Sequence, residues 1–245
     1  MPLKEPLYKY DVAILKDYGG IKSKITIHRC LRTKGLDVEN ESIKRSRGVN
    51  DKKLENNISR AKSKVFEYAY CNDWEYFVTL TISNEKFDRY NLDDYYSKFS
   101  RWLRYYSKKN NIKIDYLFIP EKHKNGAWHL HGLIKGLPFE FLKYNENGYL
   151  DWFDYKDKFG YISIDTIKNK ERCASYITKY ISKDLGKCVS DCNAKLYYCS
   201  RGLKTATEIK RGTLLADMVP DFENEYVKVA WFESKDLNKL KSFID

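Results

Sequence analysis

Residues 128–134 read Trp-His-Leu-His-Gly-Leu-Ile, and their alternation predicts a β-strand. Successive side chains of a strand point to opposite faces of its sheet, so His129 and His131 share one face. Two imidazoles held in this way on a rigid strand can bind a divalent metal ion at a fixed spacing. The alternative is a pair of exposed or core histidines without a ligand. Because the whole chain has only 4 His, we interpret the pair as a candidate metal site.

The preceding strand, expected over 114–121, bears on the third ligand. Lys124-Asn125-Gly126 predicts the turn between the two strands. A two-residue turn would leave Glu121 on the wrong face, whereas a three-residue turn with its glycine in the left-handed region pairs Glu121 with His129. The second case makes Glu121 the third ligand and leaves His123 as its rival. A carboxylate with imidazoles suits Mg²⁺, Mn²⁺ or a transition metal.

A helix predicted over about 170–185 carries the candidate nucleophiles. Its aliphatic side chains form one stripe at helical spacing, and Tyr176 and Tyr180 fall on the opposite, polar face. Adjacent lysines can lower the pKa of a phenol and neutralise a phosphate. The lysines of this face are Lys179, Lys183 and Lys187. In a chain with 21 Tyr, simple packing is the other explanation of the tyrosine pair.

The remaining pattern predicts the fold class. Helical spacing predicts helices over about 51–70 and 93–109, alternation predicts strands over 74–82 and 161–166, and Tyr18-Gly19-Gly20 predicts a hairpin of 11–16 with 21–30. The strand over 74–82 is expected inside the sheet, because both of its faces carry apolar residues. The order of elements predicts an α+β fold, in which a central antiparallel sheet has its flanking helices on one side.

Three stretches in their chain order resemble motifs I, II and III of the HUH endonucleases. They are Phe77–Thr81, His129–His131 and Tyr176–Lys183. More narrowly, they are similar to the rolling-circle replication initiators of small phages and plasmids, including the two-tyrosine type. The resemblance covers about residues 74–185 and implies a ferredoxin-like antiparallel sheet with the histidines on a central strand.

The resemblance also implies a chemistry and its residues. A divalent metal, Mg²⁺ or Mn²⁺, would polarise the scissile phosphate of single-stranded DNA at a replication origin. Tyr176 or Tyr180 would attack, leaving a 5′-phosphotyrosine bond and a free 3′-hydroxyl. Lys179 and Lys183 would complete a YxxK pattern with each tyrosine in turn. The residues expected to contact DNA are Arg172, Lys187, Thr79 and Thr81.

Two other classes of function fit the same residues. A relaxase or transposase of a mobile element would use the same chemistry on another substrate, and a non-catalytic module would bind single-stranded nucleic acid through its basic, aromatic surface. The sequence contains no GxxxxGK[ST] motif, so a replication initiator of this kind would need a separate helicase besides the host polymerase.

Charge is unevenly spread along the chain. Residues 1–70 carry 16 Lys and Arg against 9 Asp and Glu, 71–167 carry 14 of each, 168–211 carry 11 against 4, and 212–245 carry 4 against 7. Basic segments on both sides of a neutral middle favour a polyanionic partner. We expect a basic extension over 1–72, a hairpin plus helix packed on the core, then an endonuclease domain over 73–211 and an acidic segment over 212–245.

The sequence also bears on location. No apolar run approaches the roughly 20 residues of a membrane helix, and residues 1–6 lack the apolar segment of a secretory signal. We therefore expect a cytoplasmic protein without a membrane partner.

Overall fold

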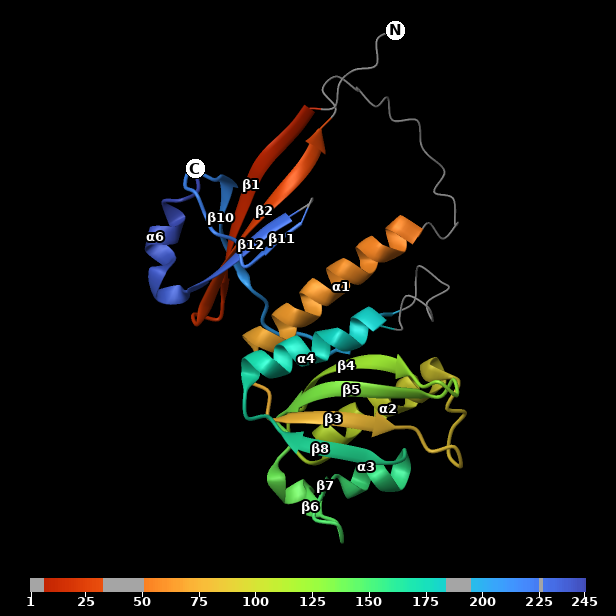
Figure 1. The fold of residues 1–245 in the computed structure, drawn as a ribbon. Coiled ribbons are helices and arrows are strands. Elements are labelled where there is room, and N and C mark those ends of the chain that lie inside the picture. Colours follow the sequence, from red (N-terminus) through yellow and green to blue (C-terminus); the bar gives the residue numbers. More distant parts are fainter. Residues whose placement is uncertain (1–6, 33–50, 184–194, 225–226) are drawn as a thin grey trace. The chain divides into compact units, whose positions relative to one another are not determined.

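The structure is a computed structural model that describes residues 7–32, 51–183, 195–224 and 227–245. Its contacts divide the chain into two compact units (Figure 1). The larger unit is Val49–Lys204, and the smaller unit combines Met1–Gly48 with Thr205–Asp245.

These units differ from the domains expected over 1–72, 73–211 and 212–245. Helix α1 (Asp51–Cys71) belongs to the larger unit, because it packs against helix α4 (Lys170–Lys183). Both ends of the chain contribute to the smaller unit, because strands from one end pair with strands from the other. Long-range pairing, rather than the change in charge along the chain, therefore sets the boundaries.

The larger unit contains a seven-stranded antiparallel sheet in the order β6-β7-β8-β3-β5-β4-β9. The strands are β3 Tyr76–Thr81, β4 Asp115–Lys122, β5 Trp128–Lys135, β6 Lys143–Tyr144, β7 Leu150–Asp151, β8 Ile162–Thr166 and β9 Tyr198–Cys199. The four longer strands predicted in this region are confirmed as β3, β4, β5 and β8. As its apolar residues predict, β3 lies inside the sheet between β8 and β5.

Helices cover both faces of this sheet, so the α+β class with flanking helices is confirmed but their expected one-sided placement is wrong. Helix α2 (Leu92–Lys109) packs its buried Phe99 and Leu103 against one face, together with α3 (Phe153–Lys158). Helix α4 contacts β4 and β5 on the other face. The physical reason is that both faces of β3 carry apolar side chains, Val78 and Leu80 on one face and Phe77 on the other, so each face needs a cover.

Strand register separates the core face from the site face. Val78 and Leu80 of β3 belong to the core beneath α2. The alternate residues Thr79 and Thr81 lie opposite His131 and His129 of β5 on the other face. Every second side chain of these strands is therefore turned toward the candidate site.

The turn between β4 and β5 has the three-residue form. The backbone N–H of His123 donates to the carbonyl of Ala127 at 2.8 Å, and Gly126 has φ of 86°. Glu121 then pairs with His129. The left-handed glycine thus sets the register that brings a carboxylate opposite an imidazole.

The smaller unit contains a five-stranded sheet in the order β10-β1-β2-β12-β11. Its elements are β1 Leu7–Tyr18, β2 Lys22–Arg32, β10 Thr207–Thr213, β11 Phe222–Glu223, β12 Val227–Glu233 and α6 Leu237–Lys241. The predicted hairpin is confirmed as β1 and β2. Leu15 and Ile25 of this hairpin form a core with Leu240 and Ile244 near the end of the chain. No helix in the described ranges is long and apolar enough to cross a membrane.

Candidate metal centre and tyrosine pair

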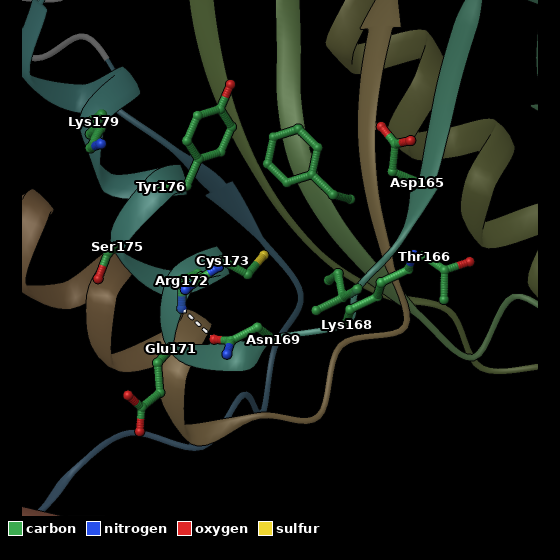
Figure 2. A pocket seen from close by; sticks show the side chains of 12 residues that line it. Asp165, Thr166, Lys168, Asn169, Glu171, Arg172, Cys173, Ser175, Tyr176 and Lys179 are labelled. Carbon is green, nitrogen blue, oxygen red and sulfur yellow. Dashed lines mark hydrogen bonds between the residues drawn. The ribbon is translucent and has the colours of Figure 1, made fainter.

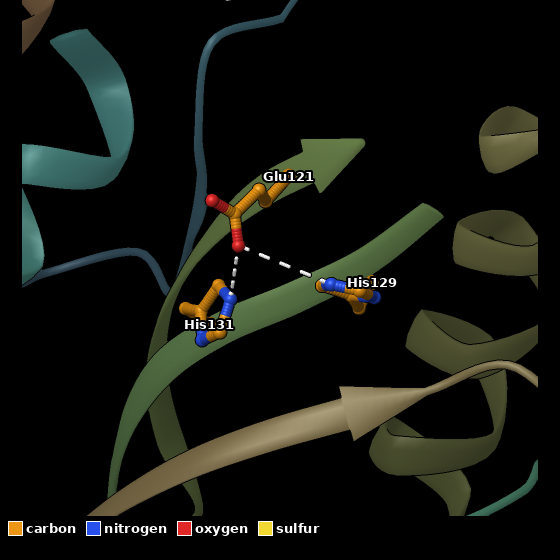
Figure 3. Close-up of side chains that lie close together, drawn as sticks. All are labelled: Glu121, His129 and His131. Carbon is orange, nitrogen blue, oxygen red and sulfur yellow. Dashed lines mark hydrogen bonds and ion pairs between the residues drawn. The ribbon is translucent and has the colours of Figure 1, made fainter. Parts of the chain in front are cut away.

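The three predicted metal ligands converge on the site face of the sheet (Figure 3). Oε2 of Glu121 lies 2.6 Å from Nε2 of His131 and 3.9 Å from Nε2 of His129. One potential ligand atom from each residue lies within 4.8 Å of the others. The neighbouring strands β4 and β5 supply all three, so the sheet itself holds them at this spacing.

Burial lowers the pKa of both imidazoles and so favours their neutral form. Burial, together with the neighbouring His123 and His131, lowers the pKa of His129 to about 4. Burial also lowers the pKa of His131, although the Glu121 carboxylate acts in the opposite direction. Neutral imidazole is the form that donates a lone pair to a metal.

Each imidazole nitrogen has a definite environment. Oγ1 of Thr79 lies 3.2 Å from Nδ1 of His131, which orients the ring with Nε2 toward Glu121. Nδ1 of His129 is buried and has no hydrogen-bond partner among the described residues. Such an unpaired buried nitrogen is uncommon. A carboxylate, two neutral imidazoles and an oriented ring together fit a divalent cation.

His123 stands beside this group rather than in it. Its ring centroid lies 3.4 Å from that of His129, and its side chain is exposed. The converging ligand atoms come from Glu121 and not from His123. The geometry thus favours Glu121 as the third ligand.

Helix α4 brings the two tyrosines to the candidate metal centre. The ring of Tyr180 stacks on His131, with centroids 3.9 Å apart and an interplanar angle of 16°. Its hydroxyl donates a hydrogen bond of 2.6 Å to the hydroxyl oxygen of Tyr176. Burial raises the pKa of Tyr180, and Tyr176 and Glu121 raise it further. Ile177 and Ile181 are fully buried, as the aliphatic stripe predicts. The expected placement of both tyrosines on an opposite, polar face is wrong, because Tyr180 packs against His131 of the sheet.

An open pocket of about 680 Å³ continues the site beyond Tyr176 (Figure 2). The predicted residues Arg172 and Lys179 line it, together with Tyr176. Cys173 lines it too, but burial raises the pKa of its thiol to about 11. At neutral pH this thiol is protonated, and a protonated thiol is a poor nucleophile.

Of the remaining predicted residues, two lie beside the histidines, and the side chains of the other two are outside the described part of the chain. Thr79 contacts His131, and Thr81 is half-buried opposite His129, so both lie beside the candidate metal ligands. Lys183 is the last residue of α4, and the position of its side chain is outside the described part of the chain, as is Lys187 altogether.

Two residues of the site were not among the predicted ones. Phe77 contacts Tyr176, with ring centroids 5.5 Å apart, and Asp165 lies opposite Phe77 in the sheet. Alternation along β3 places Phe77 on the same face as Thr79, a signal that the sequence already carries. Predicting Asp165 as a site residue would have required knowing that β8 pairs with β3, which no local pattern in the sequence reveals.

Comparison with known proteins finds a family model that matches part of the chain. No curated protein and no solved structure matches the chain. The matching family model covers residues 75–185, from the start of β3 to the end of α4, and so includes the histidine pair and both tyrosines. That model is described as replication-associated protein ORF2/G2P, and the match supports a replication-initiator family and a role in DNA replication.

Proposed function

We propose that this chain is a two-tyrosine HUH endonuclease that nicks and rejoins single-stranded DNA at an origin to initiate rolling-circle replication. One observation carries the proposal: Tyr180 stacks on a histidine of the Glu-His-His group and hydrogen-bonds Tyr176. Packing alone does not require two phenols joined in this way beside a cluster of metal-ligand atoms. A metal-assisted tyrosine attack needs a phenol beside such a cluster, and a two-tyrosine mechanism needs a second phenol within reach of it.

Tyr176 is the better placed first nucleophile. It is 48% exposed, whereas Tyr180 is half-buried under it and donates its proton toward the Tyr176 oxygen. A hydrogen bond to that oxygen stabilises the phenolate that forms as Tyr176 loses its proton. Lys179 lines the pocket beside Tyr176 and would reduce the negative charge of a bound phosphate.

The cleavage step exchanges one bond to phosphorus for another and needs no reactant other than the DNA strand. The Tyr176 oxygen forms a bond to the scissile phosphorus, and the bond from phosphorus to the 3′-oxygen breaks. The phenol loses its proton, and the departing 3′-oxygen takes one up. The products are a 5′-phosphotyrosine and a 3′-hydroxyl. A divalent cation, Mg²⁺ or Mn²⁺, held by Glu121, His129 and His131 would polarise the phosphate and offset its charge.

Rejoining uses the same groups in reverse. A 3′-hydroxyl brought to the site attacks the phosphotyrosine, which frees Tyr176 and restores the phosphodiester. Tyr180 lies next to Tyr176, so it can cleave a second strand while the first remains attached. The free 3′-hydroxyl primes a host polymerase, and a separate helicase opens the duplex, since the sequence has no P-loop.

The direct test is formation of a covalent adduct. The full chain is incubated with a pool of random single-stranded oligonucleotides in Mn²⁺ and then analysed under denaturing conditions. We expect a protein–DNA adduct with Mn²⁺ and none with EDTA or with Tyr176→Phe plus Tyr180→Phe. Tyr144→Phe, on an exposed tyrosine of β6, is the matched control and should form the adduct normally. Absence of any adduct, or an adduct that survives loss of both tyrosines, would contradict the proposal.

A further inference from the structure

The pocket beside Tyr176 has two chemically different ends (Figure 2). Tyr176 on α4 forms one end, and Asp165 on β8 forms the other. Phe77 lies between them: its ring centroid is 5.5 Å from that of Tyr176, and it pairs with Asp165 across the sheet. The pocket therefore has an aromatic floor, a phenol at one side and a carboxylate at the other.

Asp165 is an exposed carboxylate that lines the pocket. Among the described residues, it has no hydrogen-bond or ion-pair partner, although Lys168 and Arg172 line the same pocket. The backbone N–H of Arg172 donates to Oδ1 of Asn169 at 2.8 Å, which shapes the entry to α4 (Figure 2). The carboxylate is thus an accessible hydrogen-bond acceptor at the end of an aromatic surface, in a pocket that Lys168, Arg172 and the second carboxylate Glu171 also line.

We propose that this pocket binds one nucleobase of the single-stranded DNA next to the scissile phosphate, and that Asp165 selects guanine there. The inference rests on the proposed function. An aromatic floor stacks any base, because every base has a π-face. The lysine and arginine at the rim suit the phosphates on either side of that nucleotide, and phosphate contacts fix its position.

The carboxylate supplies the selectivity. A carboxylate only accepts hydrogen bonds, so it favours a base edge that presents N–H donors. The pairing edge of guanine presents two adjacent donors, N1–H and the N2 amino group, which one carboxylate accepts together. Thymine presents carbonyl oxygens on both sides of its single N–H, so its oxygens face a negative charge. Guanine should therefore be the best occupant and thymine the poorest.

The position of the pocket links this choice to cleavage. The ring that borders the pocket is that of Tyr176, the proposed first nucleophile, so a base held between Tyr176 and Asp165 belongs to a nucleotide that adjoins the attacked phosphate. Asp165 would then be a specificity residue that helps to select where the strand is cut.

The test uses two selections from one random pool of single-stranded oligonucleotides. In the first, the wild-type chain forms covalent adducts in Mn²⁺, and the attached strands are sequenced. In the second, the chain with Tyr176→Phe and Tyr180→Phe, which keeps both rings, captures strands by binding alone. Asp165→Asn is made in both forms. Asp93→Asn, an exposed residue of α2 on the other face of the sheet, is the matched control.

We expect guanine to be enriched over thymine at one position beside the cut. Asp165→Asn should reduce that ratio by about tenfold or more while leaving preferences at other positions unchanged, since a good bidentate contact discriminates by that order. Asp93→Asn should leave the ratio unchanged. An equal ratio in Asp165→Asn, or no guanine preference at any position in the wild type, would overturn the inference. Failure to form any adduct defeats the cleavage proposal separately, because the binding selection still reports the base preference.

Discussion

His131 is restrained on three sides by residues of three different elements. Glu121 of β4 contacts Nε2, Thr79 of β3 contacts Nδ1, and Tyr180 of α4 stacks on the ring. A hydrogen bond to the ring nitrogen that does not bind the metal orients an imidazole and sets its tautomer. We therefore infer that Thr79 is a positioning residue for His131, in addition to the DNA contact expected from the sequence.

Thr79→Val tests this role, because valine keeps the shape of threonine and removes only the hydroxyl. We expect Mn²⁺ affinity to fall about 10- to 100-fold, the usual cost of losing an outer contact of a metal-ligating histidine. Calorimetric titration of the purified chain with Mn²⁺ measures this directly. Thr81→Val is the control: it makes the same change on the same strand, and the described residues show no side-chain hydrogen bond for Thr81. Equal Mn²⁺ affinities in the two variants would show that Thr79 does not position His131 for metal binding.

The metal ligands themselves should be indispensable. His129→Ala with His131→Ala removes both imidazoles, so we expect no detectable Mn²⁺ binding by calorimetry and no covalent DNA adduct. His28→Ala, an exposed histidine of the smaller unit, should change neither measurement. Full adduct formation by the double variant, or by the wild type in EDTA, would show that the cluster is not a functional metal centre.

The tyrosines should divide the work unequally. Tyr180→Phe keeps the ring on His131 and loses the hydrogen bond to Tyr176, so cleavage through Tyr176 should continue at a reduced rate. Tyr176→Phe should leave a weaker adduct at Tyr180. Mass spectrometry of the adducted peptide in each single variant identifies the attachment site. If one single variant removes every adduct, the other tyrosine has a packing role only.

Elements determined by local sequence were predictable, and those determined by distant pairing were not. The β4–β5 turn has a glycine at the one position that needs a positive φ, so the register of Glu121 with His129 followed from the turn length. The buried aliphatic stripe of helix α4 likewise appears in the sequence. By contrast, β1 pairs with β10 from the other end of the chain, and nothing local in either strand identifies its partner.

Gly132 allows β5, the strand that carries both histidines, to pack closely against β4. A Cβ at this position would overlap the ring of Phe118 and lie 2.8 Å from the carbonyl oxygen of Leu117, both on β4. Gly132→Ala should therefore lower the free energy of unfolding by about 1–3 kcal/mol, as for other overpacked cores. Urea unfolding of the purified chain measures the loss. In a background with Phe118→Leu, the same alanine should cost less, because the smaller side chain leaves room. An equal cost in both backgrounds would contradict the steric explanation.

The division of the chain into two units groups its charged residues differently from the segments of the sequence. The larger unit contains every described residue of the candidate site and carries 28 Lys and Arg against 20 Asp and Glu. The smaller unit carries 17 against 14. The first basic segment, 1–70, is therefore divided between the two units, and its residues from α1 join those of α4 in one compact body.

Binding of single-stranded DNA should consequently weaken steeply as salt rises, because each neutralised phosphate releases counterions. Lys168→Ala with Arg172→Ala removes two exposed cations that line the pocket. For single strands each lost contact makes the slope of log K against log salt less negative by about 0.7, so this pair should make it less negative by roughly 1.4. Fluorescence anisotropy with a single-stranded oligonucleotide that contains all four bases, between about 50 and 200 mM salt, measures the slope. Lys108→Ala with Lys109→Ala, two exposed lysines at the end of α2, is the matched control and should leave the slope nearly unchanged. Equal slopes for the two double variants would mean that the strand does not run past the pocket, whereas a slope near zero in the wild type would remove electrostatics as the source of affinity.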